Sequence, residues 1–239
     1  MKKDGFTLAE VLITLGIIGV VAALTMPALI QKYKEKVTVS QLKKAYATIS
    51  NAYILALQEH GEFETWFPDG LTRAENTVIF FNNIKPYLRI SKDCGHNPGC
   101  FNPNPMKILN GETMSSYDDS TYEYRFILSD GSSWSIDLAS PNCISDTFCA
   151  NDNMKLDIDG LKGANTQGKD IFMFQIVAHR IYPMGIKDES SNPLFSTNCN
   201  RLSSLPLQSS ACAAWVIYNE NMDYLHCDDL DWDVKTKCD

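Results

Sequence analysis

Hydrophobic side chains fill the first part of the chain and then become periodic. Residues 11–30 form a run of 20 residues without a charge. As a helix, this run spans roughly 30 Å, the thickness of the hydrocarbon core of a bilayer. From residue 37 onward, apolar positions recur every three or four residues, as in an amphipathic helix. The pattern predicts one long helix from Phe6 to about His60, ended by Gly61.

Shorter elements are predicted after the long helix. Thr77–Ile90 has the apolar spacing of a short helix, and residues 211–218 fit either a strand or a short helix. The Ser129-Asp-Gly131 turn between two alternating runs predicts a β-hairpin. The predicted strands are 122–128, 133–138, 155–158 and 170–177. A helix followed by an antiparallel meander is an α+β fold.

Composition and charge narrow the class of protein. The chain has 239 residues, of which 44% are hydrophobic and 21% charged, which suits one sizeable globular domain or one domain with an appendage. Its formal charge is −8, but residues 1–60 carry +3 and residues 61–239 carry −11. The two parts therefore face different surroundings. The acidic balance argues against a nucleic-acid partner, which would require a basic surface.

All eight cysteines lie in the acidic part, and their even number predicts disulfides formed in an oxidising compartment. The alternatives are a reduced chain or a metal site, but no Cys-x-x-Cys is present. Neighbouring cysteines would close short loops. The predicted pairs are Cys94–Cys100, Cys143–Cys149, Cys199–Cys212 and Cys227–Cys238.

Glu10 and Pro27 are the unusual residues of the apolar helix. A carboxylate costs about 2.5 kcal/mol or more at the centre of a membrane and normally has a partner. If the chain is cut after Gly5, the new amino terminus of Phe6 lies four residues before Glu10, along the same helix face. An N-terminal ammonium, from the same subunit or a neighbouring one, is then the expected partner. Pro27 removes a backbone donor and predicts a kink or local unwinding near residues 23–27.

These residues carry a resemblance. The segment Gly5-Phe-Thr-Leu-Ala-Glu10, followed by an apolar helix with Pro27, closely resembles the class III signal of type IV prepilins and type II secretion pseudopilins. The resemblance implies that a membrane peptidase cuts after Gly5 and methylates Phe6, and that Glu10 guides assembly. It also implies a pilin-like α+β fold, in which the long helix packs on an antiparallel sheet with disulfide-rich loops. The implied segments are a leader (1–5), a transmembrane helix (6–30), an amphipathic half-helix (31–60) and an extracytoplasmic globular domain (61–239).

The same resemblance implies partners and a location. The partners are the prepilin peptidase, other pilin or pseudopilin subunits, the inner-membrane assembly platform and membrane lipid. The chain would cross the cytoplasmic membrane once and enter a surface fibre after assembly. The positive-inside rule alone predicts the opposite orientation, because five lysines follow the apolar run and two precede it. The cysteines and the resemblance favour an exported C-terminal domain.

An acidic, glycine-rich loop is the main candidate for cofactor chemistry. Oxygen donors recur at Asp157, Asp159, Asn165 and Asp170, with three glycines between them. Ca²⁺ takes 6–8 oxygen ligands, and some major pseudopilins bind it in an acidic loop in this part of the fold. The spacing is not that of an EF-hand. The alternative is a structural turn in which Asp and Asn side chains cap the backbone.

Two functions remain open. The leading hypothesis is a structural subunit, major or minor, of a type IV pilus or a secretion pseudopilus. The alternative is an adhesin-like tip subunit that recognises a ligand, a glycan or an exported protein through loops 94–121 and 190–212. Tryptophans 66, 134, 215 and 232 would stack on sugars or lie in the core, and the acidic tail 228–233 would hold a partner or be solvated. No catalytic motif is present, so an enzyme is not expected.

Overall fold

The computed structural model describes residues 7–139, 152–163, 165–187, 194–202 and 209–238. It divides into two compact units, Met1–Thr38 and Val39–Asp239. A single helix, α1 (Leu8–His60, 53 residues), crosses the boundary between them. The long helix predicted from the sequence is therefore confirmed.

The part of α1 in the first unit is long and apolar enough to cross a membrane. Its most apolar stretch has a mean hydropathy of 2.3, and none of it is buried within the chain. The hydroxyls of Thr14 and Thr25 donate to the carbonyls of Glu10 and Val21, each at 2.9 Å, which satisfies them inside the helix. The helix runs unbroken through Pro27, so of the kink or local unwinding predicted near residues 23–27, the unwinding is absent. The backbone continues because only one hydrogen bond is lost at the proline.

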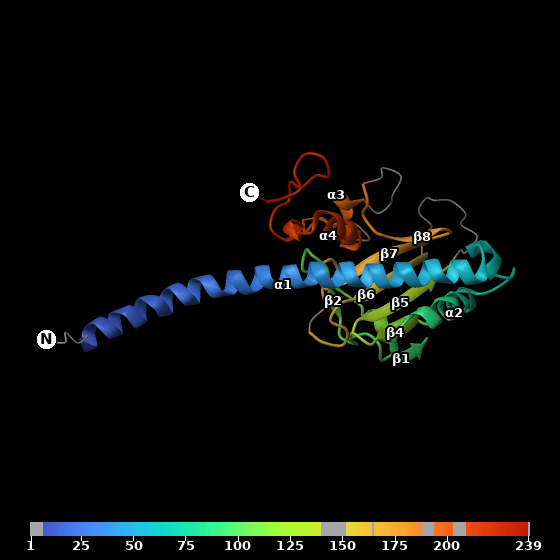
Figure 1. Cartoon of the computed structure of the whole chain (residues 1–239), viewed down its shortest axis with the longest axis horizontal. Helices are drawn as coiled ribbons and strands as arrows, with labels where there is room; N and C mark the ends of the chain where they lie inside the picture. Colours follow the sequence, from blue (N-terminus) through green and yellow to red (C-terminus); the bar gives the residue numbers. More distant parts are fainter. Residues whose placement is uncertain (1–6, 140–151, 164, 188–193, 203–208, 239) are drawn as a thin grey trace. The chain divides into compact units, whose positions relative to one another are not determined.

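In the second unit, α1 packs one face onto a β-sheet (Figure 1). Leu42, Ile49 and Tyr53 on this face are fully buried. Tyr46 stacks on Phe174 of the sheet with ring centroids 5.7 Å apart. The Tyr53 hydroxyl lies 2.9 Å from the carbonyl oxygen of Val177, which closes the contact with a polar interaction in an apolar setting.

The sheet has six strands in the order β1-β4-β5-β6-β7-β8, and every neighbouring pair is antiparallel. This confirms the α+β class and the predicted hairpin. The strands are β1 (Ile90–Gly95), β4 (Tyr124–Leu128), β5 (Ser133–Leu138), β6 (Asp152–Asp157), β7 (Ile171–Val177) and β8 (Arg180–Pro183). A separate pair joins β2 (Met106–Lys107) to β3 (Thr113–Met114).

The remaining helices are short and lie around the sheet. The α-helices are α2 (Arg73–Ile84), α3 (Phe195–Asn198) and α4 (Ala213–Asn219). The 3₁₀ turns are η1 (Phe63–Trp66), η2 (Lys85–Tyr87), η3 (Tyr117–Asp119), η4 (Ser210–Cys212) and η5 (Asp223–Leu225). Residues 211–218, which the sequence left open between a strand and a short helix, thus form mainly helix α4.

Helix α2 begins earlier than its apolar spacing predicted. Thr72 accepts a hydrogen bond from the Glu75 backbone N–H, and the Glu75 side chain accepts one from the Thr72 N–H, forming a capping box. Phe81 of α2 then lies against Phe126 of β4, with centroids 5.0 Å apart. Helix α2 therefore lies beside α1 on the same face of the sheet, where Tyr53 and Phe80 also meet at 5.5 Å.

The opposite face of the sheet is polar yet buried. Across it, Arg125 pairs in register with Ser135, and Ser135 with Lys155. The Arg125 guanidinium is fully buried and donates to backbone carbonyls of residues 96–120, including that of Tyr117 at 2.9 Å. Lys155 forms an ion pair with Glu123 at 2.6 Å. These interactions hold the loop after β1 over this face.

Three of the four predicted disulfides lie among the described residues and are present: Cys94–Cys100, Cys199–Cys212 and Cys227–Cys238. The fourth, Cys143–Cys149, lies outside the described residues. Within the described part of the chain no cysteine is free. Because the pairs are local in sequence, each closes a loop in the part of the domain that has little regular structure.

A close backbone approach fixes the C-terminal part to the sheet. Gly185, just after β8, has φ +91°, and a Cβ placed there would lie 1.9 Å from the Ala211 carbonyl oxygen. Next to it, the Ala214 N–H donates to the Met184 carbonyl at 3.0 Å. Only glycine permits this contact, so α4 is held against the end of β8.

We therefore expect Gly185→Ala to be strongly destabilising. The matched control is Gly131→Ala, because Gly131 has φ +90° but open space around its Cβ position. The control should lose about 1 kcal/mol of unfolding free energy from positive φ alone. Gly185→Ala should lose at least about 2 kcal/mol more from the steric clash. Chemical denaturation of the full chain checks this, and equal losses would contradict the role of the close approach.

Candidate functional site

The first candidate site is the N-terminal end of α1. Thr7 precedes the helix and caps it: the Thr7 N–H and hydroxyl each donate to Glu10 Oε2 at 2.8 Å. In return, the Glu10 N–H donates to the Thr7 hydroxyl at 3.3 Å. This is a capping box, so the sequence Thr-x-x-Glu starts the helix as it does at α2. Gly5 and Phe6, the predicted processing residues, lie outside the described residues.

Glu10 thus has a partner inside its own chain. The predicted partner, the ammonium of a processed Phe6, falls outside the described residues. The capping box was not anticipated, although its signal is visible in the sequence as Thr7 and Glu10 three residues apart. Any ammonium that binds Glu10 must share its carboxylate with the Thr7 donors, or replace them.

The second candidate site is the acidic loop between β6 and β7. The structure brings Asp157 and Asn165 together, because the Asn165 amide nitrogen donates to Asp157 Oδ2 at 2.8 Å. Asp157 Oδ1 accepts the backbone N–H groups of Asp159 at 3.2 Å and Gly160 at 3.0 Å. Gly160 has φ +68°, and a Cβ there would lie 2.2 Å from the Gly131 carbonyl oxygen. Asp157 therefore organises a tight turn, as the structural alternative predicted.

Asp170 closes the same loop. Its Oδ2 accepts the Thr166 N–H at 3.0 Å. Burial raises the pKa of Asp170 to about 7, with a further contribution from the negative charge of Asp159. Burial, followed by the interaction with Asp159, also raises the pKa of Asp157 well above its ordinary value. Asp157 and Asp170 are therefore near one exposed carboxylate, that of Asp159.

Among the described residues of this loop, the buried side-chain oxygen of Asn165 has no hydrogen-bond partner. Asn165 is only 6% exposed, and its Oδ1 forms no hydrogen bond, while its amide nitrogen points to Asp157. Within the described ranges, no group of three or more His, Cys, Asp and Glu residues is arranged to hold a metal ion. The loop thus places the unpaired Oδ1 of Asn165 near the carboxylate of Asp157, but its described residues do not form a preformed metal site.

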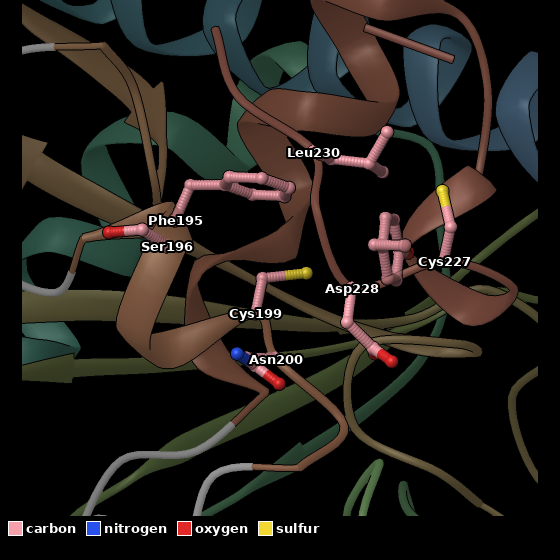
Figure 2. Close-up of a pocket in the computed structure, with 8 residues that line it drawn as sticks. Phe195, Ser196, Cys199, Asn200, Cys227, Asp228 and Leu230 are labelled. Atoms are coloured by element: carbon pink, nitrogen blue, oxygen red, sulfur yellow. The ribbon is translucent and has the colours of Figure 1, made fainter. Parts of the chain in front are cut away.

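A third feature is a pair of adjoining hollows beside the C-terminal loop. The smaller, of about 90 Å³, lies between α3 with its following residues and the loop closed by Cys227–Cys238 (Figure 2). The larger, of about 350 Å³, shares Phe195, Ser196 and Leu230 with it and is also lined by Trp232. A binding role was predicted for loop 190–212, and the acidic tail 228–233 was left open between holding a partner and being solvated. Residues of both segments line the larger hollow. What was not predicted is that these two segments lie together.

The structure also shows where the four tryptophans and the acidic tail 228–233 lie. Trp66, Trp134 and Trp215 are buried in the core, whereas Trp232 is only partly buried. The tail is exposed but not merely solvated, because most of its carboxylates are ion-paired. The pairs are Asp228 with Arg201, Asp229 with Lys235, and Asp233 with Lys187.

The acidic loop predicts a dependence of stability on pH. A carboxyl group whose pKa is raised by folding contributes stability below its ordinary pKa and loses it as the pH rises through the folded value. For Asp170 the ordinary value is 3.8 and the folded value about 7. In EDTA, the unfolding free energy should therefore fall as the pH rises through this window, and Asp157 should extend the fall to higher pH.

Asp170→Asn keeps an oxygen that can accept the Thr166 N–H and should flatten this fall, whereas Asp69→Asn, at an exposed position, should not. Denaturant unfolding at a series of pH values measures both. A slope unchanged by Asp170→Asn would show that this carboxyl group does not titrate as described.

Comparisons with known proteins agree with the N-terminal reading. Residues 1–26 match the family model described as a prokaryotic N-terminal methylation motif. Residues 28–214 match the model described as a family of unknown function, DUF6613. No curated protein and no solved structure matches the chain. The chain therefore belongs to the DUF6613 family, and its N-terminus carries the type IV prepilin and pseudopilin signal.

Proposed function

We propose that this protein is a structural subunit, major or minor, of a type IV pilus or a type II secretion pseudopilus. The observation that carries the proposal is the first unit itself. In this unit, α1 begins with the Thr7–Glu10 capping box and presents an apolar surface that is not buried within the chain. The same helix continues into the disulfide-bonded domain, where it packs against the sheet. The prepilin signal at residues 1–26 supports processing by the prepilin peptidase and assembly with other pilin subunits.

The physical chemistry of assembly follows from this helix. Before assembly, lipid covers its apolar side chains, and the domain after residue 60 lies on the extracytoplasmic side. In a fibre, the same side chains are covered by the helices of neighbouring subunits. Glu10 would then exchange its Thr7 donors for the methylated amine of Phe6, because an unpaired carboxylate is costly in a water-poor core. The inner-membrane platform would extract the subunit from the lipid.

The alternative is an adhesin-like minor pilin at the tip of the fibre. What supports it is that loops are held by disulfides and by buried hydrogen bonds, such as the segment after β1 that Cys94–Cys100 closes and Arg125 anchors. Rigid loops on a scaffold are the usual place for recognition. Labelling the protein along isolated filaments distinguishes the two roles, since a tip subunit is confined to one end.

The role of Glu10 is tested by Glu10→Gln and Glu10→Ala. Glutamine keeps an oxygen that can accept the Thr7 donors but removes the charge, so we expect normal helix formation, membrane insertion and processing. Intact mass spectrometry should still find a methylated Phe6 at the N-terminus. Incorporation into sheared fibres should fall strongly for both variants, because the carboxylate no longer pairs with an amine.

The matched control is Glu75→Ala in the second capping box. There, Thr72 donates to Glu75 Oε2 through its N–H at 2.8 Å and its hydroxyl at 2.7 Å, nearly as at Glu10. Its loss costs about 1 kcal/mol of helix capping and should leave incorporation unchanged. If Glu75→Ala reduced incorporation as much as Glu10→Ala, and Glu10→Gln did not reduce it, the loss of a capping box and not the loss of the charge would explain the effect.

We also infer that the acidic loop binds calcium. The residues fit the ion in one respect that the structural turn leaves unexplained: the buried Oδ1 of Asn165 lacks a donor, and a cation would satisfy it. Asp157, Asp159 and Asp170 would supply carboxylate oxygens. Bound calcium would neutralise the repulsion among these three groups and cross-link the ends of β6 and β7.

Thermal unfolding with Ca²⁺, with Mg²⁺ and with EDTA tests this site. We expect stabilisation by Ca²⁺ above that by Mg²⁺, because Ca²⁺ accepts irregular coordination by oxygen ligands, whereas Mg²⁺ demands near-octahedral geometry. Asp159→Asn should abolish the difference, while Glu112→Gln, at an exposed position elsewhere, should preserve it. Equal unfolding temperatures in all three conditions would leave the loop as a structural turn only.

A further inference from the structure

The larger hollow beside the C-terminal loop has the form of a ligand cleft. Its volume of about 350 Å³ falls in the range of small-molecule sites. Three separate segments contribute to it: the residues after β8, the start of α3, and the disulfide-closed loop after Cys227. Its apolar lining consists of Ile186, Leu194, Phe195, Leu230 and Trp232.

The aromatic part of this lining is held in place by the core. Phe195 stacks on Trp215 with ring centroids 4.1 Å apart and an interplanar angle of 10°. Trp232 packs against Trp215 at 5.0 Å and against Phe195 at 5.8 Å. Because Trp215 is fully buried, it holds the rings of Phe195 and Trp232 in place from the core side. A ligand would therefore meet a preformed surface and would not have to order it.

The charges around the cleft do not balance. Lys187 forms an ion pair with Asp233 across the lining, so these two charges compensate each other. Asp231 forms no ion pair among the described residues. Its Oδ1 accepts the N–H groups of Asp233 at 2.8 Å and Val234 at 3.1 Å, which caps a turn and fixes the carboxylate beside Trp232. The cleft therefore combines apolar walls with one uncompensated negative charge.

We propose that this cleft binds a basic side chain, lysine or arginine, presented by another polypeptide. The alkyl stem of such a side chain fits apolar walls, while its cationic head requires a carboxylate. An aromatic ring at the same place adds a cation–π attraction. The surrounding domain, residues 61–239, has a net charge of −11, which attracts a basic partner and repels an acidic one. The loop closed by Cys227–Cys238 thus forms one wall of a peptide-docking site.

The proposal does not depend on the role of the protein in a pilus, because it concerns only the second unit. It is tested with N-acetyl-lysine amide as the probe and its Nε-acetylated form as the uncharged counterpart. The protein is the full chain in nanodiscs of zwitterionic lipid. The signals observed are the tryptophan indole N–H resonances, with that of Trp232 identified by Trp232→Phe.

The expected result is a saturable shift of the Trp232 signal with the charged probe, and little or none with the uncharged one. The signals of Trp66 and Trp134, buried elsewhere in the core, should not move. Asp231→Asn keeps an oxygen for the turn but removes the charge, and should weaken binding about tenfold or more, as expected for a charged contact. Asp229→Asn in the same loop does not line the cleft and should have little effect.

Three results would overturn the proposal. Equal binding of both probes would make the cleft merely hydrophobic. Equal effects of Asp231→Asn and Asp229→Asn would reduce the attraction to the general charge of the domain. A shift of the Trp232 signal with methyl glucoside but not with the lysine probe would identify a sugar site instead.

Discussion

The burial of one face of α1 against the six-stranded sheet is the interaction on which the rest of this structure depends. Leu42 and Ile49 are completely buried there, and each such side chain contributes about 1.5–3 kcal/mol. The same helix has no buried face before residue 39. One continuous secondary structure therefore serves two environments, an apolar one along its first half and a packed protein core along its second.

The opposite side of the sheet is stabilised by different forces. There, Arg125, Lys155 and Glu123 replace the aliphatic core with a buried polar network. Arg125 is matched by backbone carbonyls and not by a carboxylate, so it fastens a loop without requiring a second charged side chain. Local disulfides add to this by restricting the unfolded chain. On this side of the sheet, buried hydrogen bonds, an ion pair and local disulfides thus hold the loops, in place of a large hydrophobic layer.

Much of this arrangement was predictable where the signal is local. The long helix, the β4–β5 hairpin and the three described disulfides follow from periodicity, a turn and cysteine spacing. Strand β1 was not predicted, because Ile90–Gly95 has no alternation and pairs with β4 through two irregularities in register. In the candidate sites, Asp157 was recognised as an oxygen donor, but its capping of the Gly160 turn depends on backbone geometry. Phe195 and Trp232 meet only because distant segments fold together, which one sequence does not reveal.

The edges of the sheet limit how copies of this protein can associate. At one edge, β1 carries Lys92 and Asp93, and its two register shifts bend the strand. At the other, β8 ends in Pro183, and the Tyr46 hydroxyl takes up the Ile181 carbonyl at 3.1 Å. Both edges are thus poor templates for an incoming strand. Assembly of copies by pairing strands between molecules is therefore disfavoured. Amyloid-like aggregation through the sheet edges competes poorly with association of copies through their helices.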